Sequence, residues 1–345
     1  MPGGRIIALD GLRGVAAITV MLRHSPPIGV PFEYGYLAVD LFFMLSGFVL
    51  ARAYEPRFAV GLSFSDYFRQ RLARLYPMLL IGSLLGLLVF NLGLSDFVPQ
   101  DALDLWLAIG GQLLLVPLLS SYPTSFAFNG PQWSIAFELI ANLLHRAIFR
   151  HLGLRFLVQL TGLCGLLTVV YALKLGGLNY GWRHGEFLLG VPRALFGFFL
   201  GVILCRTEGR WGQYIPALPF AVPAVLTALL AVGPLWSEGS AILRPLHDLA
   251  LLLLAMPLIV MLGVRARPHA LAGHLGTLSY PLYAIHLPVL TALHVAAVPV
   301  VLRYPVMALL PLAAWILGKW FDEPLSEARR ARAAQLKFKT APLAG

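Results

Sequence analysis

The sequence predicts an all-α protein, a polytopic bundle of about ten transmembrane helices. Of its 345 residues, 59% are hydrophobic and 12% are charged, whereas soluble domains average about 25% charged residues. The mean hydropathy is +0.78 over the whole chain, and a soluble protein has too little interior to hide that much apolar surface. Apolar runs recur at lengths near the ~20 residues that cross a bilayer as a helix.

The expected spans are the segments that show this apolar pattern. They are residues 8–24, 36–54, 76–94, 131–149, 156–173, 186–205, 214–233, 245–263, 275–297 and 303–320. Glycines four residues apart, at Gly82 and Gly86 and at Gly197 and Gly201, predict close helix packing within the bundle.

The charges give the expected orientation of these spans. With the N-terminus in the cytoplasm, most of the 26 Lys and Arg residues fall in inside segments, as the positive-inside rule requires. The outside segments hold only Lys174, Arg183, Arg244 and Arg303. Two further arginines, Arg23 and Arg193, fall at or within spans. We therefore expect both termini in the cytoplasm, and the net charge of +10 reflects topology rather than nucleic-acid binding.

Two segments stand apart from the regular spans. Residues 326–345 are rich in Arg and Lys, which predicts a basic cytoplasmic tail against the anionic inner leaflet. Residues 102–119 are apolar, but if they crossed the membrane the basic tail would lie outside. We therefore expect residues 102–119 to be interfacial or re-entrant on the outer side.

The first span, LDGLRGVAAITVMLRH, carries Arg13 near its inner end and His24 near its outer end. A charge in a span costs roughly 2.5–3.5 kcal/mol at the bilayer centre, so it faces a partner or a cavity. Arg13 could hold a phosphate group, and a neutral His24 could take a proton from a hydroxyl. Alternatively, Arg13 pairs with Asp10 one turn earlier, and His24 is an interfacial polar residue. The first interpretation suits a long phosphorylated carrier.

A second basic group precedes the third span. The segment RQRLARLYP places Arg71 and Arg74 on one helix face, with Arg69 nearby. Three arginines at the cytoplasmic edge could clamp phosphates. The alternative is ordinary positive-inside anchoring of the helix.

Five motifs, in order, resemble those of the acyltransferase-3 family of membrane enzymes. The first is the arginine, ten residues, histidine spacing from Arg13 to His24, followed by GYLAVDLFFMLSGFVLARAY and by the Arg-x-x-Arg motif at Arg71 and Arg74. NGPQWSIAFELIANLL resembles the family's Trp-Ser-Leu-x-x-x-Glu helix, with Ile135 in place of leucine, and LSYPLYAIHLPV resembles its late helix. The resemblance covers most of residues 5–325, which implies an acyltransferase-like transmembrane domain over 1–325 and a tail over 326–345.

The resemblance implies a donor, an acceptor and a base. Acetyl-CoA or another acyl-CoA would enter from the cytosol, with Arg71 and Arg74 near its phosphates and Arg13 assisting. His24 would activate a hydroxyl of a sugar-containing acceptor, such as a surface polysaccharide or a glycolipid. No metal is expected. The setting would be the bacterial inner membrane, and any second transfer step would need a separate extracytoplasmic partner enzyme.

Further polar residues are candidates for the same site. Either Glu138 or Asp40 could orient His24, as carboxylates do in catalytic triads, although Asp40 could merely cap or pair at a helix end. Candidates to bind substrate or to stabilise the developing oxyanion are Trp133, Ser134, Tyr283 and His286. His286 precedes Leu287 and Pro288, so it could instead satisfy backbone groups beside that proline.

Two rival classes fit the composition. A multi-span transporter would also bury charged residues, but it does not specifically need an arginine pair at the cytoplasmic edge together with His24. A non-catalytic membrane protein that binds acyl-CoA or lipid would need the arginines but not the histidine.

Overall fold

The computed structural model describes residues 5–25, 30–117, 123–233 and 242–329. Within these ranges the fold is all-helical, as predicted, and pairing between extended segments is limited to two isolated bridges. The α-helices are α1 (Ile7–Arg23), α2 (Ala38–Ala59), α3 (Phe64–Asn91), α4 (Ala102–Leu114), α5 (Gln132–Ile148), α6 (Leu154–Leu175), α7 (Gly190–Arg206), α8 (Glu208–Trp211), α9 (Ala221–Leu229), α10 (Leu243–Ala250), α11 (Met256–Arg265), α12 (Ala270–Val295) and α13 (Val300–Leu317). Shorter helical turns are η1 (Val30–Leu37), η2 (Phe149–His151), η3 (His184–Leu189), η4 (Leu251–Ala255) and η5 (Gly318–Asp322).

Among the described residues, 7 helices are long and apolar enough to cross a membrane. They are Pro31–Ala59, Phe64–Asn91, Leu154–Leu175, His184–Arg206, Leu243–Arg265, Ala270–Val295 and Val300–Arg329. The helices in the other three expected spans are shorter: α1 and α5 have 17 residues each, and α9 has 9. The count of ten spans and the cytoplasmic location of both termini stay predictions.

The apolar segment before α5 forms only a short helix. α4 has 13 residues, fewer than the ~20 that cross a bilayer. It ends at Leu115, whose φ of 57° is left-handed, and residues 118–122 lie outside the described residues. Trp106 and Leu114 are largely exposed on α4. A length of 13 residues fits the prediction that this segment does not cross, and its place at the interface stays a prediction.

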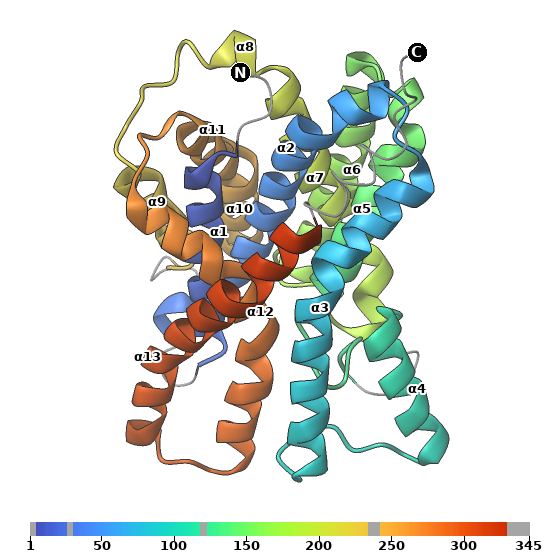
Figure 1. Ribbon diagram of the computed structural model, residues 1–345, viewed down its shortest axis with the longest axis vertical. Coiled ribbons are helices and arrows are strands. Elements are labelled where there is room, and N and C mark those ends of the chain that lie inside the picture. The colour runs from blue at the N-terminus through green and yellow to red at the C-terminus, as the bar shows by residue number, and fades with distance from the viewer. Residues whose placement is uncertain (1–4, 26–29, 118–122, 234–241, 330–345) are drawn as a thin grey trace, which may run out of the picture.

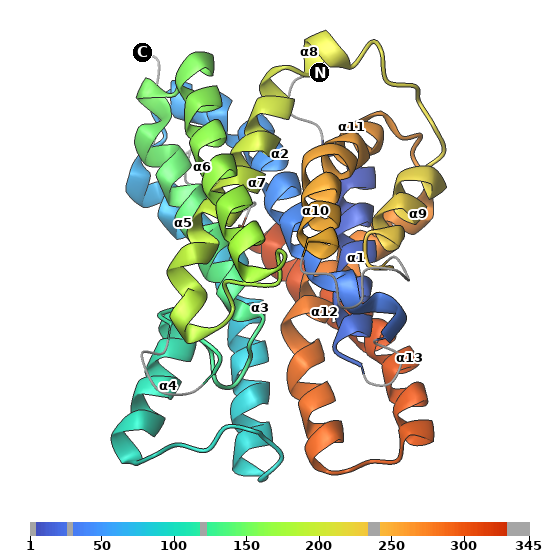
Figure 2. The same cartoon turned by 180° about the vertical axis from the view of Figure 1, so that it is seen from behind.

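The bundle is held together by close helix pairs. α1 packs along α12 and α2 along α7, as Figures 1 and 2 show from opposite sides. A Cβ atom at Gly201 would collide with the carbonyl oxygen of Met44, and one at Gly82 with that of Ala284. Small residues therefore let the helix backbones touch, which confirms the close packing predicted from the glycine spacing.

Prolines bend two of the long helices, α3 and α12 (Figure 1). A proline has no N–H to donate to the carbonyl four residues earlier, so that carbonyl needs another partner. Pro77 frees the carbonyl of Ala73, which accepts a hydrogen bond from Arg329. Pro288 frees the carbonyl of Ala284, which accepts one of 2.8 Å from Nδ2 of Asn129.

The ends of the helices fall into two groups at opposite ends of the molecule. The starts of α1, α3 and α12 and the ends of α2, α7 and α11 gather at one end of the molecule (Figures 1 and 2). The α3–α4 and α12–α13 connections lie at the opposite end. Of the predicted basic tail, residues 330–345 lie outside the described residues.

Candidate active site

A partly buried ion pair joins two of the predicted site residues. Nη2 of Arg71, on α3, donates a hydrogen bond of 3.1 Å to Oε1 of Glu138, on α5. The same oxygen accepts a hydrogen bond of 2.8 Å from the hydroxyl of Ser46, on α2. Arg71 is only 7% exposed, and its Nε is buried without a hydrogen-bond partner among the described residues. Arg71 therefore has a donor left over beside Glu138.

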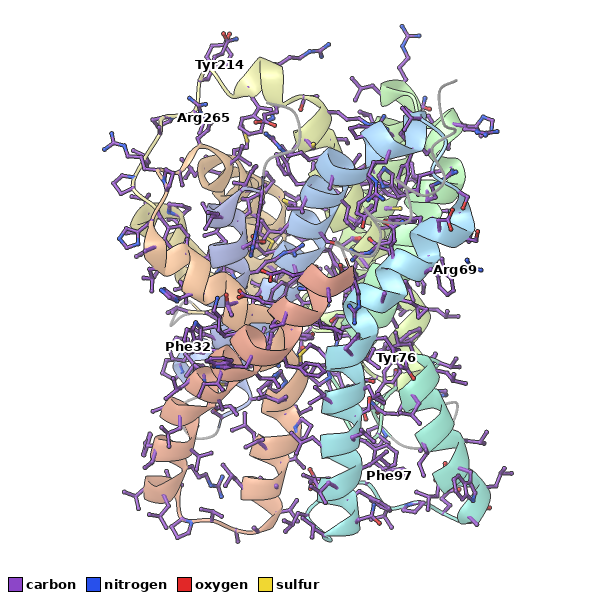
Figure 3. All side chains as sticks on the ribbon, viewed as in Figure 1. Phe32, Arg69, Tyr76, Phe97, Tyr214 and Arg265 are labelled. Carbon is purple, nitrogen blue, oxygen red and sulfur yellow. The ribbon has the colours of Figure 1, made fainter. Side chains whose placement is uncertain are left out.

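Arg74 forms an ion pair with Asp322, a residue 248 positions later in the sequence. Its Nη1 donates hydrogen bonds of 2.7 and 2.8 Å to the two carboxylate oxygens of Asp322, in η5. Its guanidinium also lies 5.6 Å from the ring centroid of Tyr280. Arg69, by contrast, is exposed and points away from the bundle (Figure 3). The structure thus keeps Arg71 and Arg74 in the candidate site and leaves Arg69 out.

Arg13 lies close enough to Arg71, Arg74 and Glu138 to interact with them electrostatically. It forms no hydrogen bond or ion pair with any described residue, since Asp10 accepts a bond of 2.5 Å from Nε of Arg5 instead. The Asp10–Arg13 ion pair that the sequence allowed is therefore not formed.

These residues together make a site with an excess of positive charge. The cluster of Arg13, Arg71, Arg74, Glu138 and Asp322 holds three guanidinium groups and two carboxylates. Asp10 also acts electrostatically on Arg13 but is itself paired with Arg5, so one positive charge is left over when that ion pair is counted with the cluster. Guanidinium groups bind phosphate oxygens well, so the cluster is suited to an anionic group such as a phosphate.

His24 lies at the C-terminal end of α1, eleven residues beyond Arg13. Its Nδ1 is 2.9 Å from the carbonyl oxygen of Val20. A carbonyl oxygen can only accept, so in a neutral ring Nδ1 carries the hydrogen and Nε2 keeps a free lone pair. A free Nε2 lone pair is what a general base needs.

His286, on α12, has its ring next to that of His24, and its side chain is fully buried. The two ring centroids are 5.3 Å apart. Nδ1 of His286 is 3.0 Å from the carbonyl oxygens of Leu282 and Tyr283, which fixes the same tautomer as in His24. His286 thus satisfies backbone groups, as one interpretation of the sequence held, but its Nε2 is buried without a partner among the described residues.

Ser134 and Tyr283 connect the histidines to the cationic cluster. Their hydroxyl oxygens are 2.7 Å apart, so one hydroxyl donates to the other, and the carbonyl oxygen of Pro131 lies 3.1 Å from the Ser134 hydroxyl and 3.2 Å from the Tyr283 hydroxyl. The Tyr283 ring lies 5.7 Å from that of His286, and a narrow recess borders Tyr283. Ser134 is one helical turn before Glu138 on α5, so the two share a helix face. Polar side chains therefore follow one another from the arginines to the histidines.

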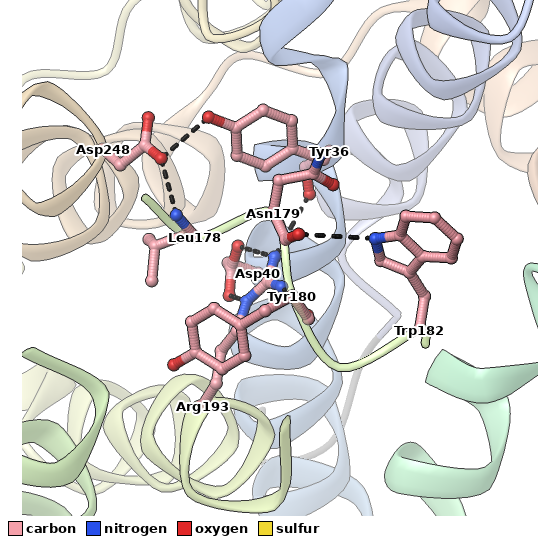
Figure 4. A network of polar contacts seen from close by, with 8 residues as sticks. All are labelled: Tyr36, Asp40, Leu178, Asn179, Tyr180, Trp182, Arg193 and Asp248. Carbon is pink, nitrogen blue, oxygen red and sulfur yellow. Dashed lines mark hydrogen bonds and ion pairs between the residues drawn. The ribbon is translucent and has the colours of Figure 1, made fainter. Parts of the chain in front are cut away.

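Asp40 does not orient His24. It accepts two hydrogen bonds of 2.7 Å from Nε and Nη2 of Arg193, on α7, and both side chains are buried (Figure 4). Arg193 also donates to the carbonyl of Tyr180, at 2.7 Å. Trp133 lies on this side of the bundle, with its ring centroid 5.7 Å from the Arg193 guanidinium. The prediction that Asp40 assists His24 is wrong, because the carboxylate pairs with a buried cation instead.

The second carboxylate candidate has other partners as well. Glu138 accepts from Ser46 and Arg71 and has no hydrogen bond to His24. No motif pointed to Arg193 as a site residue. A lone arginine in the apolar segment 186–205 nevertheless indicates that a buried partner is present.

A second buried carboxylate lies beside the Asp40–Arg193 ion pair. Asp248, at the start of the α10–α11 segment, accepts hydrogen bonds of 2.7 Å from the Tyr36 hydroxyl and from the Leu178 amide (Figure 4). These bonds tie the loop after α6 to α10 and to η1, which leads into α2. The network therefore links several helices of the bundle to one another, next to the candidate site.

Comparisons with known proteins agree with the motifs. The family model for an acyltransferase domain, Acyl_transf_3, matches residues 6–320. "Protein 2 in picA locus" of Rhizobium radiobacter is 35% identical over 46% of this chain and 88% of its own length. Acyltransferase MdmB of Streptomyces mycarofaciens is 32% identical over 39% of this chain and 36% of its own.

A longer match is YrhL of Bacillus subtilis (strain 168), provisionally named a peptidoglycan O-acetyltransferase. It is 23% identical over 83% of this chain and 48% of its own length. The chain thus spans half or less of MdmB and YrhL. No solved structure matches the chain.

The chain belongs to the acyltransferase-3 family, because the family model covers nearly all of it. The matched region is an acyltransferase domain by the description of its family, and 7 of the chain's described helices are long and apolar enough to cross a membrane.

Proposed function

We propose that the protein transfers an acyl group, specifically acetyl, from acyl-CoA to a hydroxyl of a sugar-containing acceptor. The observation that carries this proposal is the line of polar side chains from the arginine cluster, through Glu138, Ser134 and Tyr283, to the two histidines.

The two ends of this line suit the two ends of acyl-CoA. The donor carries its phosphates far from its thioester, so it needs a cationic site and a reactive site at a distance. Arg13 and His24 are eleven residues apart on α1, which is about 16 Å along a helix. Arg13 and Arg71 offer unpaired donors to the phosphates, and His24 lies where the thioester would reach the acceptor.

The reaction then follows from the state of His24. Its free Nε2 takes the proton of the acceptor hydroxyl while the hydroxyl oxygen attacks the thioester carbonyl carbon. The C–S bond breaks, and the leaving thiolate takes up the proton to give the free thiol of CoA. Ser134 and Tyr283, whose hydroxyls contact each other beside His286, are the groups that would stabilise the negative charge developing on the carbonyl oxygen.

The acceptor is proposed from the relatives and the setting. YrhL is provisionally named for peptidoglycan, which is a sugar polymer, and a surface polysaccharide or a glycolipid presents similar hydroxyls. The bacterial inner membrane is the proposed location, because acyl-CoA is then available on the inner side.

The test uses membranes from cells with and without the gene, supplied with radiolabelled acetyl-CoA. Surface glycans and extracted metabolites are then analysed by mass spectrometry for a gain of one acyl group. His24→Ala should abolish transfer while expression and acetyl-CoA binding persist. His294→Ala, an exposed histidine on the same helix as His286, is the matched control.

The same experiment separates the rival classes. A transporter would move a solute and leave no acylated product. A non-catalytic acyl-CoA-binding protein would keep its phenotype in His24→Ala and lose it when the arginines are changed. Full transfer by His24→Ala would remove the proposed base.

A further inference from the structure

A group of arginine and tyrosine side chains lies at the end of α1 that carries His24, apart from the arginine cluster at Arg13. Arg23 and Arg13 are ten residues apart on α1, which is about 15 Å along a helix. The group, called the Arg23 cluster below, comes from α1, η1 and α10 and consists of Arg23, Glu33, Tyr34, Tyr36 and Arg244. None of these side chains has a role in the reaction proposed above.

A glycine lets η1 close against α1 at this point. A Cβ atom at Gly35 would collide with the carbonyl oxygen of Thr19 and with Cβ of Arg23. In this close contact Nη1 of Arg23 donates a hydrogen bond to the carbonyl oxygen of Glu33. The ring centroid of Tyr36 lies 5.1 Å from the guanidinium carbon of Arg23. A backbone carbonyl and an aromatic ring therefore hold the Arg23 guanidinium in place.

Arg244 is the second guanidinium group of the Arg23 cluster. Its Nη2 donates a hydrogen bond of 2.8 Å to Oε1 of Glu33. Its guanidinium carbon lies 5.2 Å from the ring centroid of Tyr34 and 5.8 Å from that of Tyr36. Aromatic rings attract guanidinium groups, so Tyr36 holds both arginines near one another. Arg23 and Arg244 are close enough to repel each other electrostatically, and an anion bound beside both would relieve that repulsion.

Arg23 has no carboxylate as its own partner. Among the described residues it donates to a backbone carbonyl and forms no ion pair, whereas Glu33 is paired with Arg244. The next carboxylate, Asp248, already accepts hydrogen bonds from a tyrosine hydroxyl and a backbone amide (Figure 4). A guanidinium group has five N–H donors, so Arg23 can bind a further acceptor. Its side chain is only partly buried, so a ligand can reach it.

We propose that Arg23 and Arg244 bind an acidic group of the acceptor, a carboxylate or a phosphate, close to the hydroxyl that receives the acyl group. This inference rests on the proposed function and narrows the acceptor to acidic sugar-containing molecules. Arg23 directly precedes His24 in the sequence and acts electrostatically on its ring. The Arg23 cluster would therefore place the acceptor at the proposed base.

The donor does not supply the anion for this site. The phosphates of acyl-CoA are far from its thioester, and the proposed function places the thioester at His24 and the phosphates near Arg13 and Arg71. The acceptor must bring its hydroxyl to His24, so an acidic group on the same or a neighbouring sugar lies within reach of Arg23. Guanidinium groups bind carboxylates and phosphates through paired hydrogen bonds. Sugars that carry a carboxylate or a phosphate are therefore the matching acceptors.

The test uses the full-length protein in membranes, with acetyl-CoA as donor and surface glycan from cells that lack the gene as acceptor. The glycan is supplied in three forms. One is untreated, one has its carboxylates reduced to alcohols by carbodiimide and borohydride, and one has its phosphates removed by hydrofluoric acid. The treated forms show whether a carboxylate or a phosphate is the group that binds. The measurements are kcat and the KM values for the glycan and for acetyl-CoA.

Three variants give different expected results. Arg23→Gln removes the charge, so it should raise the KM for untreated glycan at least about tenfold and leave the KM for acetyl-CoA unchanged. Glu33→Gln removes the carboxylate that competes for Arg244, so it should lower the glycan KM about three- to tenfold. Arg183→Gln changes an exposed arginine outside the Arg23 cluster, and it should match the wild type.

The treated glycans test the wild-type protein directly. Removal of the acidic group that binds should raise the wild-type KM for glycan at least about tenfold. On that sample Arg23→Gln should no longer differ from the wild type. The wild-type comparison needs no substitution, so it decides the inference even if Arg23→Gln fails to fold.

Three results would overturn the inference. If the wild type uses both treated glycans as well as the untreated one, no acidic group is bound. If Arg23→Gln shows the same loss on all three samples, Arg23 supports the fold or acts on the reacting carbonyl instead. If Arg23→Gln leaves the glycan KM unchanged, the arginine binds another anion, such as a lipid head group.

Failure of this inference differs from failure of the proposed function. If the glycan gains acetyl groups but neither the treatments nor Arg23→Gln changes its KM, only the acidic-group site is lost. If no sample gains an acetyl group, the proposed function fails and the acidic-group site fails with it.

Discussion

Arg193 donates two hydrogen bonds of 2.7 Å to the two oxygens of Asp40, and the side chains are 1% and 0% exposed. The pair joins α7 to α2 across the centre of the bundle, beside Trp133 and Tyr180. Within an apolar bundle each charge has lost its water, so each depends on the other. This geometry places Asp40 in the frame of the protein rather than in its chemistry.

The first prediction concerns the stability of this pair. Arg193→Leu and Asp40→Leu, each alone, should destabilise the protein by about 3–5 kcal/mol, because each leaves a buried charge unpaired. The double variant should be closer to the wild type than either single variant. Thermal unfolding of the purified protein in detergent measures this.

The control for that prediction is Arg183→Leu, since Arg183 is well exposed and lies 3.9 Å from Glu186. It should change stability by less than about 1 kcal/mol. If the single variants at Asp40 and Arg193 unfold at the wild-type temperature, the pair does not hold the frame.

The second prediction concerns donor binding by the arginine cluster. Arg13→Gln and Arg71→Gln should raise the KM for acetyl-CoA at least tenfold, because a hydrogen bond to a charged group contributes about 1.5–3 kcal/mol. With S-acetylpantetheine, a donor without phosphates, both variants should behave like the wild type. Initial rates of thiol release measure both effects.

Arg69→Gln is the matched control, since this exposed arginine lies on the same helix and points away from the bundle. Its KM should not change. Equal losses with both donors would show that the arginines support the fold rather than bind phosphate.

A third prediction addresses Asp322, which occupies the guanidinium of Arg74. A donor phosphate at Arg74 would compete with this carboxylate. Asp322→Asn removes the competing charge, so it should tighten acetyl-CoA binding about three- to tenfold. Equilibrium binding of acetyl-CoA to the purified protein measures the change.

Glu323→Gln serves as the comparison, because that neighbouring carboxylate binds Thr277 and Lys319 rather than Arg74. It should leave binding unchanged. Weaker binding by Asp322→Asn, together with a lower unfolding temperature, would mean that Asp322 anchors the end of α13 instead.

The fourth prediction tests the link between a helix proline and its substitute partner. Asn129→Ala leaves the carbonyl of Ala284 unpaired in the bundle, at a cost of about 1–3 kcal/mol. Pro288→Ala restores a helical N–H to that carbonyl, so adding it to Asn129→Ala should recover part of the loss. A double-mutant cycle of unfolding free energies measures the coupling, and strictly additive effects would contradict it.

Several parts of the site could be predicted from the sequence because their spacing is local. Arg71 and Arg74 are three residues apart, so one helix brings both to the same region, and Arg13 and His24 are fixed at opposite parts of α1. The motifs of the family mark Ser134, Glu138, Tyr283 and His286 before any coordinates are known. The close packing at Gly82 and at Gly201 also follows from the four-residue spacing of Gly82 and Gly86 and of Gly197 and Gly201.

The partners of the charged groups could not be predicted in the same way. Asp40 and Arg193 are 153 residues apart in sequence, and Arg74 and Asp322 are 248 residues apart. Which cation meets which carboxylate depends on the packing of whole helices and on how far prolines bend them. The sequence therefore suggested Asp40 as a possible partner of His24, whereas in the folded bundle Asp40 pairs with Arg193.

The amino-acid sequence by itself determined that this protein is a helical membrane protein and a member of the acyltransferase-3 family. Apolar run lengths, the placement of Lys and Arg, and short motifs are local properties, and local properties can be read along the chain. Only the tertiary structure decided which buried polar groups pair and which stay free, including the bare Nε2 of His286. In a medium without water, the packing of the helices makes that choice, because neighbouring protein groups are the partners within reach of a buried donor or acceptor.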